Sequence, residues 1–386
     1  MNRTLAVVGF VAFATSLSFR ALDPGIALIA LDFGMAPERA ALASTAFALP
    51  FALAQPILGP IADAIGKTRV ITLCVVLLLA ASLAGAVAPS FPFLIVTRIA
   101  AGIAAGGIFP VAIATAGDLV PVERRQIVLG RLLACALSGA VLGATVGGVV
   151  GDLFGWRGVL LVLAACSAVA LAGAVYGFAK VPRGEGKTFN FAAAVAGYRN
   201  ILANPLAKVC FGAVFVEGAC VFGVLPFVAI ILHGSGEERA TIAGLVVAGF
   251  PIGGVILSLT LPLLLVLFGQ RGLMMLGGSL VGCAFVAFAL AGLWQFDLAA
   301  FVVIGIGFYM IHTGIQVFTT ELAPNARASA VALHAMFFFL GQGAGPVVYG
   351  LGFATLGETA SLCISAMLML VLGLVCASKL RRPQAA

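Results

Sequence analysis

Residues 59–88 read GPIADAIGKTRVITLCVVLLLAASLAGAVA. The first third of this stretch is polar and carries Asp63, Lys67 and Arg69, whereas the part after Arg69 contains no charged side chain. A helix needs roughly 20 apolar residues to cross the hydrocarbon core of a membrane. The stretch therefore predicts a membrane-spanning helix over 70–88 that is entered from a short polar loop.

The same alternation of apolar runs and polar loops continues through all 386 residues, of which 62% are hydrophobic and 9% charged. Soluble domains carry roughly 25% charged residues, so this chain cannot cover a globule with polar surface. A transmembrane β-barrel would show shorter, alternating segments. The predicted fold is an all-α membrane protein with twelve transmembrane helices, over 5–30, 40–60, 70–88, 91–116, 126–150, 157–179, 207–232, 240–266, 272–292, 297–317, 328–351 and 359–378.

The twelve predicted spans fall into two halves. DLVPVER at 118–124 is matched by ELAPNAR at 321–327, and the glycine-rich segment 143–148 is matched by 345–350. The two pairs are offset by 203 and 202 residues, which indicates an internal duplication of the kind that builds secondary transporters. The predicted domains are an N-terminal six-helix bundle over 1–179, a cytoplasmic linker over 180–206 and a C-terminal six-helix bundle over 207–386.

The distribution of cations predicts the orientation in the membrane. With the N-terminus inside, the cytoplasmic segments hold sixteen Lys and Arg residues and the opposite side holds three. This positive-inside bias predicts that both termini lie in the cytoplasm. The apolar stretch from Leu5 runs on to Ile29 without a convincing small-residue cleavage site, so we expect the first span to be retained and not cleaved as a signal. The cations form no stripe for nucleic acid, and the eight cysteines have no metal-ligand spacing, so neither partner is expected.

Three motifs resemble those of the major facilitator superfamily. The first is the loop GPIADAIGKTR at 59–69. The second is RIAAGIAAGG at 98–107 in the fourth span, similar to a family motif whose arginine is implicated in proton coupling. The third is GATVGG at 143–148, similar to the antiporter signature of the drug:proton branch, although Ala144 stands where that signature has proline.

The resemblance implies two pseudo-symmetric bundles that rock against each other, in a monomer of the bacterial inner membrane that needs no cofactor. Its partners would be a small-molecule substrate, protons and the lipid bilayer. The loop motif would control gating through Gly59, Asp63, Gly66, Lys67 and Arg69.

Ionisable side chains within membrane spans are costly unless paired or hydrated, so they mark candidate functional sites. Arg20 and Asp23 lie near the outer end of the first span, and Arg98 lies near the outer end of the fourth. The helical rise places all three roughly 8–12 Å below the outer surface. We expect either a structural Arg–Asp–Arg network or a coupling and substrate site, in which Asp23 is the proton-coupling carboxylate.

A second set of polar side chains lies in the other half. Glu217 and His312 fall near the middle of the seventh and tenth spans. A carboxylate and an imidazole can both exchange protons, so Glu217 is a second proton-coupling candidate, and His312 is either a cavity residue or packing. We also assign Gln316, one turn from His312, to the cavity. His334 lies close to the start of the eleventh span and is expected at the membrane interface.

The sequence therefore favours a secondary transporter that moves a small organic molecule by alternating access, as a proton-coupled exporter. Uptake of an organic anion by proton symport is the alternative, because two buried arginines could bind a carboxylate. Facilitated diffusion is a third reading. An enzyme is not expected, since the chain contains no HExxH, GxSxG or phosphate-binding GxxxxGK[ST] pattern.

Overall fold

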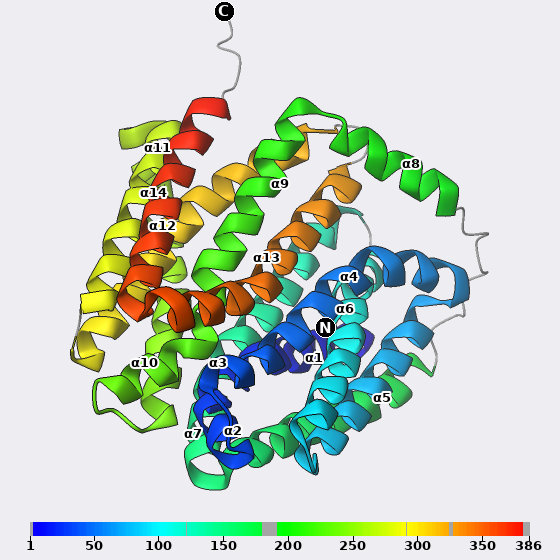
Figure 1. Ribbon diagram of the computed structural model, residues 1–386. Helices are drawn as coiled ribbons and strands as arrows, with labels where there is room; N and C mark the ends of the chain where they lie inside the picture. Colours follow the sequence, from blue (N-terminus) through cyan, green and yellow to red (C-terminus); the bar gives the residue numbers. More distant parts are fainter. Residues whose placement is uncertain (1–2, 121, 180–190, 291, 324–326, 381–386) are drawn as a thin grey trace, which may run out of the picture. The chain divides into compact units, whose positions relative to one another are not determined.

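The computed structural model describes residues 3–120, 122–179, 191–290, 292–323 and 327–380, which form helices joined by short turns, with no strand among them (Figure 1). The chain folds as two compact units. Unit 1 is Met1–Asn190 with Arg239–Gly244, and unit 2 is Phe191–Glu238 with Leu245–Ala386. The all-α fold predicted from the sequence is confirmed. The predicted linker over 180–206 begins with 180–190, which lies outside the described residues, while 191–202 form a helix, and its boundaries stay a prediction.

Unit 1 begins with an interrupted membrane span. Three long helices follow it, and then a long element that turns back on itself. Its elements are α1 (Arg3–Arg20), the 3₁₀-helix η1 (Asp23–Gly25), α2 (Ile26–Phe33), α3 (Pro37–Ala40), α4 (Leu42–Ile65), α5 (Lys67–Ala86), α6 (Phe91–Asp118) and α7 (Val122–Phe178). Pro24 at the start of η1 cannot donate a backbone hydrogen bond, and the α-helix gives way there to a short 3₁₀ turn. Asp23 therefore sits at an interruption of the first span.

Unit 2 begins with a helix too short to be counted as a membrane span and continues with five long segments. Its elements are α8 (Phe191–Leu202), α9 (Pro205–Glu217), the π-helix η2 (Gly218–Phe222), the 3₁₀-helix η3 (Leu225–Phe227), α10 (Val228–Gly234), most of α11 (Ala240–Leu290), α12 (Trp294–Glu321), α13 (Arg327–Leu356) and α14 (Glu358–Lys379). The segment from α9 to α10 forms one interrupted span, Pro205–Gly234. Glu217 is the last residue before its π-helical turn.

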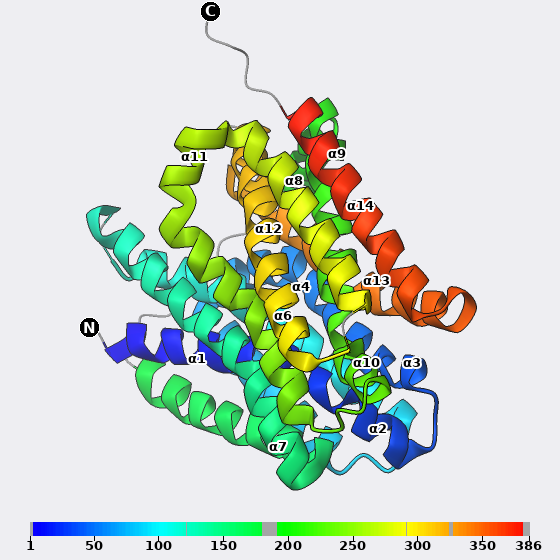
Figure 2. The same cartoon turned by 90° about the vertical axis from the view of Figure 1, so that its left-hand side faces the viewer.

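Ten helical segments in the described residues are long and apolar enough to cross a membrane. The prediction of twelve fits this number because α7 and α11 each contain two predicted spans. The backbone leaves the helical region at Gly155 (φ 69°) and at Gly269 (φ 61°), where a positive φ favours glycine. Figure 2 shows both elements turning back on themselves. Each glycine lies between two predicted spans, so the two elements correspond to four crossings.

Glycines let α7 pack directly on the backbone of α1 in unit 1. A Cβ atom at Gly139, Gly143 or Gly147 would collide with a carbonyl oxygen of α1 or of the residue after it. Small residues at helix contacts in membranes allow this close approach. The glycines of the segment 143–148 thus help to hold the end of α1, and with it Arg20, in a fixed position.

Unit 2 repeats this arrangement with different helices. A Cβ atom at Gly341 of α13 would collide with the carbonyl oxygen of Phe215, and one at Gly345 would collide with that of Ala219. Gly218 meets the backbone of α13 from the opposite side. The duplicated glycine segments therefore support equivalent helix contacts in the two units, and the contact in unit 2 fixes the turn that carries Glu217.

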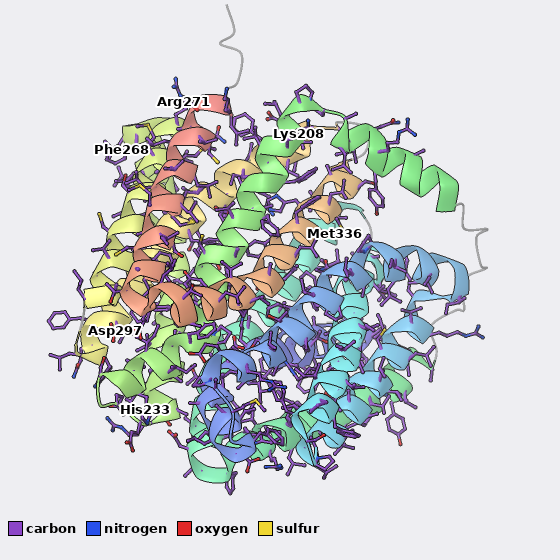
Figure 3. All side chains as sticks on the ribbon, viewed as in Figure 1. Lys208, His233, Phe268, Arg271, Asp297 and Met336 are labelled. Carbon is purple, nitrogen blue, oxygen red and sulfur yellow. The ribbon has the colours of Figure 1, made fainter. Side chains whose placement is uncertain are left out.

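Figure 3 distinguishes the two ends of unit 2. Lys208 and Arg271 lie at one end, where the Arg271 Nε donates a hydrogen bond to the Ala377 carbonyl at 3.0 Å. His233 and Asp297 lie at the other end. We call the first of these the Lys208 end.

Candidate functional site

Asp23 is the centre of a buried polar cluster in unit 1. Its Oδ2 atom lies 3.1 Å from Arg20 Nη1, and its Oδ1 atom accepts a hydrogen bond of 2.6 Å from the Ser44 hydroxyl. The carboxylate is 2% exposed. Because both carboxylate oxygens have donors, Asp23 is bound on two sides, by its own span and by α4.

Arg98 reaches the same cluster from α6. Its Nε atom lies 3.4 Å from the carbonyl oxygen of Ala43, and its guanidinium carbon lies 4.4 Å from the centre of the Phe47 ring. Its charge also acts on Asp23. The three ionisable residues that the sequence placed at one depth therefore lie in one cluster, but the direct ion pair is between Arg20 and Asp23.

Glu217 and His312 form a second buried site, in unit 2. His312 Nδ1 lies 2.9 Å from Glu217 Oε2, and the glutamate is fully buried. The Oε1 atom of Glu217 has no hydrogen-bond partner among the described residues. A hydrogen between these two atoms can belong to either of them, so the pair can hold a proton.

His334 and Thr319 extend this site beyond His312. The Nε2 atoms of the two histidines are 3.5 Å apart, and His334 Nδ1 lies 3.1 Å from the Thr319 hydroxyl. The same hydroxyl donates to the Ile315 carbonyl at 3.0 Å. Glu217, His312, His334 and Thr319 thus form a continuous chain of polar contacts, which we call the His–His chain.

Aromatic rings surround the middle of the His–His chain. His312 stacks on Phe308 with ring centres 4.9 Å apart, and it also contacts Phe338 at 5.0 Å. Phe222 contacts both of these phenylalanines, and Phe250 contacts Phe308. The side chain of His312 keeps 15% of its surface exposed, so this aromatic group covers most of the imidazole and leaves part of it accessible.

The structure gives less information on the remaining predicted site residues, Gln316 and the loop motif. Gln316 lies on α12 with an exposed side chain, and no hydrogen bond joins it to His312 within the described part of the chain. Of the loop motif, Gly66 ends α4 with φ +103°, and α5 begins at Lys67. Gly59 and Asp63 lie in α4, but their side chains are outside the described residues, so their gating role stays a prediction.

Sequence reasoning missed Ser44 and Thr319 and placed His334 at the interface, whereas it is 3% exposed in the packed interior. One signal was available for the histidine. His312 lies nine residues before the end of α12 at Glu321, and His334 lies seven residues after the start of α13 at Arg327. Similar distances from a shared turn indicate similar depth. Ser44 gave no such signal, because a serine in an apolar span commonly bonds its own helix.

A family model described as Major Facilitator Superfamily matches residues 8–346 and 214–386. The chain belongs to the Major Facilitator Superfamily. The predicted resemblance is confirmed; members of this superfamily are multi-pass membrane transporters of small molecules and are not enzymes.

Curated relatives in the superfamily include proteins named for drug resistance. A chloramphenicol resistance protein of Streptomyces lividans is 30% identical over 149 residues, which are 38% of this chain and 37% of that protein. The quinolone resistance protein NorA of Staphylococcus aureus is 25% identical over 176 residues, 44% of this chain and 45% of that protein. The matches thus span less than half the length of these relatives.

Solved transporters have the same fold. A bacterial homologue of the human lysosomal transporter Spinster, in an inward-facing and unoccupied conformation, aligns with a TM-score of 0.76 at 19% identity and covers 99% of this chain and 98% of its own. A peptide transporter, POT, in complex with alafosfalin aligns with a TM-score of 0.79 at 15% identity, covering 98% and 94%. At such identities the likeness shows the fold alone.

Proposed function

We propose that this superfamily member exports small amphipathic organic molecules in exchange for protons, and that Glu217 carries the coupled proton. The observation that carries the proposal is the contact of 2.9 Å between Glu217 and His312, with the other carboxylate oxygen unpartnered among the described residues. A carrier must bind a proton and release it again. In Glu217 one carboxylate oxygen has no partner among the described residues and the other contacts an imidazole. Such a carboxylate meets that need better than one whose two oxygens are both held by donors.

Asp23 is a rival site for coupling, as the sequence suggested. Its oxygens are bound by Arg20 and Ser44, so a proton arriving there must displace an ion pair. Such displacement could accompany transport, with substrate and proton competing for one charge environment. The two sites lie in different units, so variants can separate them.

The substrate class is supported by the aromatic rings of unit 2 and by the relatives. Phe308, Phe338 and Phe222 pack around an imidazole that is partly open, an environment suited to a molecule with both ring and polar groups. The similar proteins from Streptomyces and Staphylococcus are named for resistance to chloramphenicol and quinolones. Both drugs combine an aromatic ring with polar substituents.

Uptake of an organic anion is the second candidate function. The guanidinium of Arg98 is buried, and among the described residues it has no direct carboxylate partner. An arginine in that state could bind a substrate carboxylate. In this reading Asp23 and Arg20 would orient Arg98 and would not carry a proton.

Transport into proteoliposomes separates these functions by the sign of the pH gradient. Radiolabelled chloramphenicol is a suitable probe because it has no group that ionises near neutral pH. An antiporter concentrates the probe on the acidic side, whichever way the protein is inserted. A symporter concentrates its substrate on the alkaline side, and facilitated diffusion concentrates it on neither. Accumulation of chloramphenicol on the alkaline side of the membrane would contradict the proposal.

We further propose that the protein lies in the bacterial inner membrane with both termini and the Lys208 end in the cytoplasm. Lys187→Cys, within the predicted linker, is expected to react with an impermeant maleimide in inverted vesicles but not in intact cells. Glu238→Cys, exposed before α11, is the matched control and should react in intact cells. The reverse labelling pattern would overturn this orientation.

A further inference from the structure

The His–His chain runs lengthwise through unit 2 and ends close to the Lys208 end. Asn204 Nδ2 donates to the Leu322 carbonyl at 3.2 Å, so α9 begins beside the point where α12 ends. Counted from there, Glu217 lies roughly 18 Å deep and His312 roughly 14 Å deep, at 1.5 Å per residue. Thr319 is two residues from the end of α12, so it lies only roughly 3 Å deep, although its side chain is fully buried in this conformation.

We propose that His312, His334 and Thr319 form a proton relay that connects Glu217 with water at the Lys208 end of unit 2. This inference rests on the proposed role of Glu217 and names the path by which that residue exchanges its proton. Three independent elements, α9, α12 and α13, supply the members. A packing role for any one of them would not require their ring nitrogens to face each other in series.

The hydrogen-bond directions allow two states of the relay. When the Thr319 hydroxyl donates to Ile315, it can only accept from His334, which must then carry its hydrogen on Nδ1. A neutral His334 then accepts on Nε2 from His312. His312 in turn accepts on Nδ1, and the donor on its other side is a protonated Glu217.

The second state reverses every bond. Thr319 rotates and donates to Nδ1 of His334, which donates from Nε2 to His312, which donates from Nδ1 to the Glu217 carboxylate. Neither histidine is charged in either state. The two states differ by one proton on Glu217, by the tautomer of each histidine and by the rotation of one hydroxyl.

Loading Glu217 from the second state is a balanced series of transfers. When the Lys208 end opens to water, a hydronium ion gives a proton to the Thr319 oxygen, and the hydroxyl passes its own hydrogen to His334 Nδ1. His334 then passes its Nε2 hydrogen to His312, which passes its Nδ1 hydrogen to Glu217. One hydronium and one carboxylate become one water and one carboxylic acid, and Thr319 then turns back to Ile315.

Other titratable groups near the relay are thiols. Cys210 of α9 lies beside Thr319, and Cys220 of η2 and Cys376 of α14 lie within the electrostatic reach of Glu217. Glu321 is two residues beyond Thr319, at the end of α12. None of these groups stands between the members of the His–His chain.

Time-resolved infrared spectroscopy after a pH jump tests the relay in the full-length protein in lipid nanodiscs, without a substrate. The carbonyl stretch of a protonated carboxyl group reports loading, and its loss in Glu217→Gln assigns it. His334→Asn keeps an amide near Thr319 but has no atom in place of Nε2. We expect it to slow loading by about a hundredfold, the scale that positioned proton-transfer groups contribute. Thr319→Val, which keeps the side-chain shape, should slow loading as well.

His233→Gln is the matched control, because His233 lies at the opposite end of unit 2 and is exposed. It should load at the wild-type rate. If His334→Asn and Thr319→Val also load at that rate while Glu217→Gln lacks the band, the relay is wrong and the proton site stands. If Glu217→Gln keeps the band, Glu217 is not the group that loads, and the proposed proton site fails with the relay.

Discussion

Glu217→Gln is expected to remove the accumulation of chloramphenicol driven by a pH gradient. Glutamine has the shape of glutamic acid, and its amide can still donate to His312 Nδ1, but it cannot release a proton. The gradient-driven rate in proteoliposomes should fall by about a hundredfold. Exchange of labelled for unlabelled probe across the same membranes, which needs no net proton movement, should continue.

The control for this variant is Asp297→Asn, which removes another buried carboxylate from the same unit. Asp297 is 2% exposed and lies at the end of unit 2 away from Lys208 (Figure 3). Its loss should leave the gradient-driven rate unchanged. Full pH-dependent accumulation by Glu217→Gln would transfer the coupling role to Asp23.

Asp23→Asn is expected to destabilise the folded protein as well as to stop transport. The substitution breaks the buried ion pair between Arg20 and Asp23, which costs about 3 kcal/mol or more. The unfolding temperature of the purified protein should therefore fall clearly. The double variant Arg20→Gln/Asp23→Asn removes both charges and should recover most of that loss.

The same double variant decides between the two carboxylates. If Asp23 serves only to hold Arg20 and Arg98, a stable double variant should regain gradient-driven transport in part. If Asp23 carries the proton, stability should return while transport loses its dependence on the gradient. An unfolding temperature of Asp23→Asn equal to that of the wild type would contradict the buried ion pair itself.

The sequence predicted the fold well because membrane insertion depends on the length and apolarity of each segment. The breaks at Gly155 and Gly269 fell where charges and glycines separated the runs. The shared depth of Arg20, Asp23 and Arg98 could also be counted along the helices. What counting could not supply was the rotation of each helix about its own axis, on which the partners of a side chain depend.

The site in unit 2 shows that limit. Glu217, His312 and His334 were visible as intramembrane polar residues, but their contacts depend on how α9, α12 and α13 face one another. The sequence favoured Asp23 over Glu217 as the proton site, because residue spacing along the helices placed two arginines at the depth of Asp23. Glu217 has an oxygen without a partner among the described residues, and Asp23 contacts Ser44. Both features result from side-chain packing and cannot be deduced by counting residues along a helix.

The π-helical turn Gly218–Phe222 has a consequence for comparing this chain with its relatives. Its hydrogen bonds enclose one residue more than those of an α-helix, so the turn holds one residue in excess of the regular pitch. Relatives whose seventh span is regular throughout should therefore align with a one-residue gap at this turn. A deletion within 218–222 would leave the flanking faces in phase. A deletion earlier in α9 would rotate the residues before it by roughly 100° relative to Glu217.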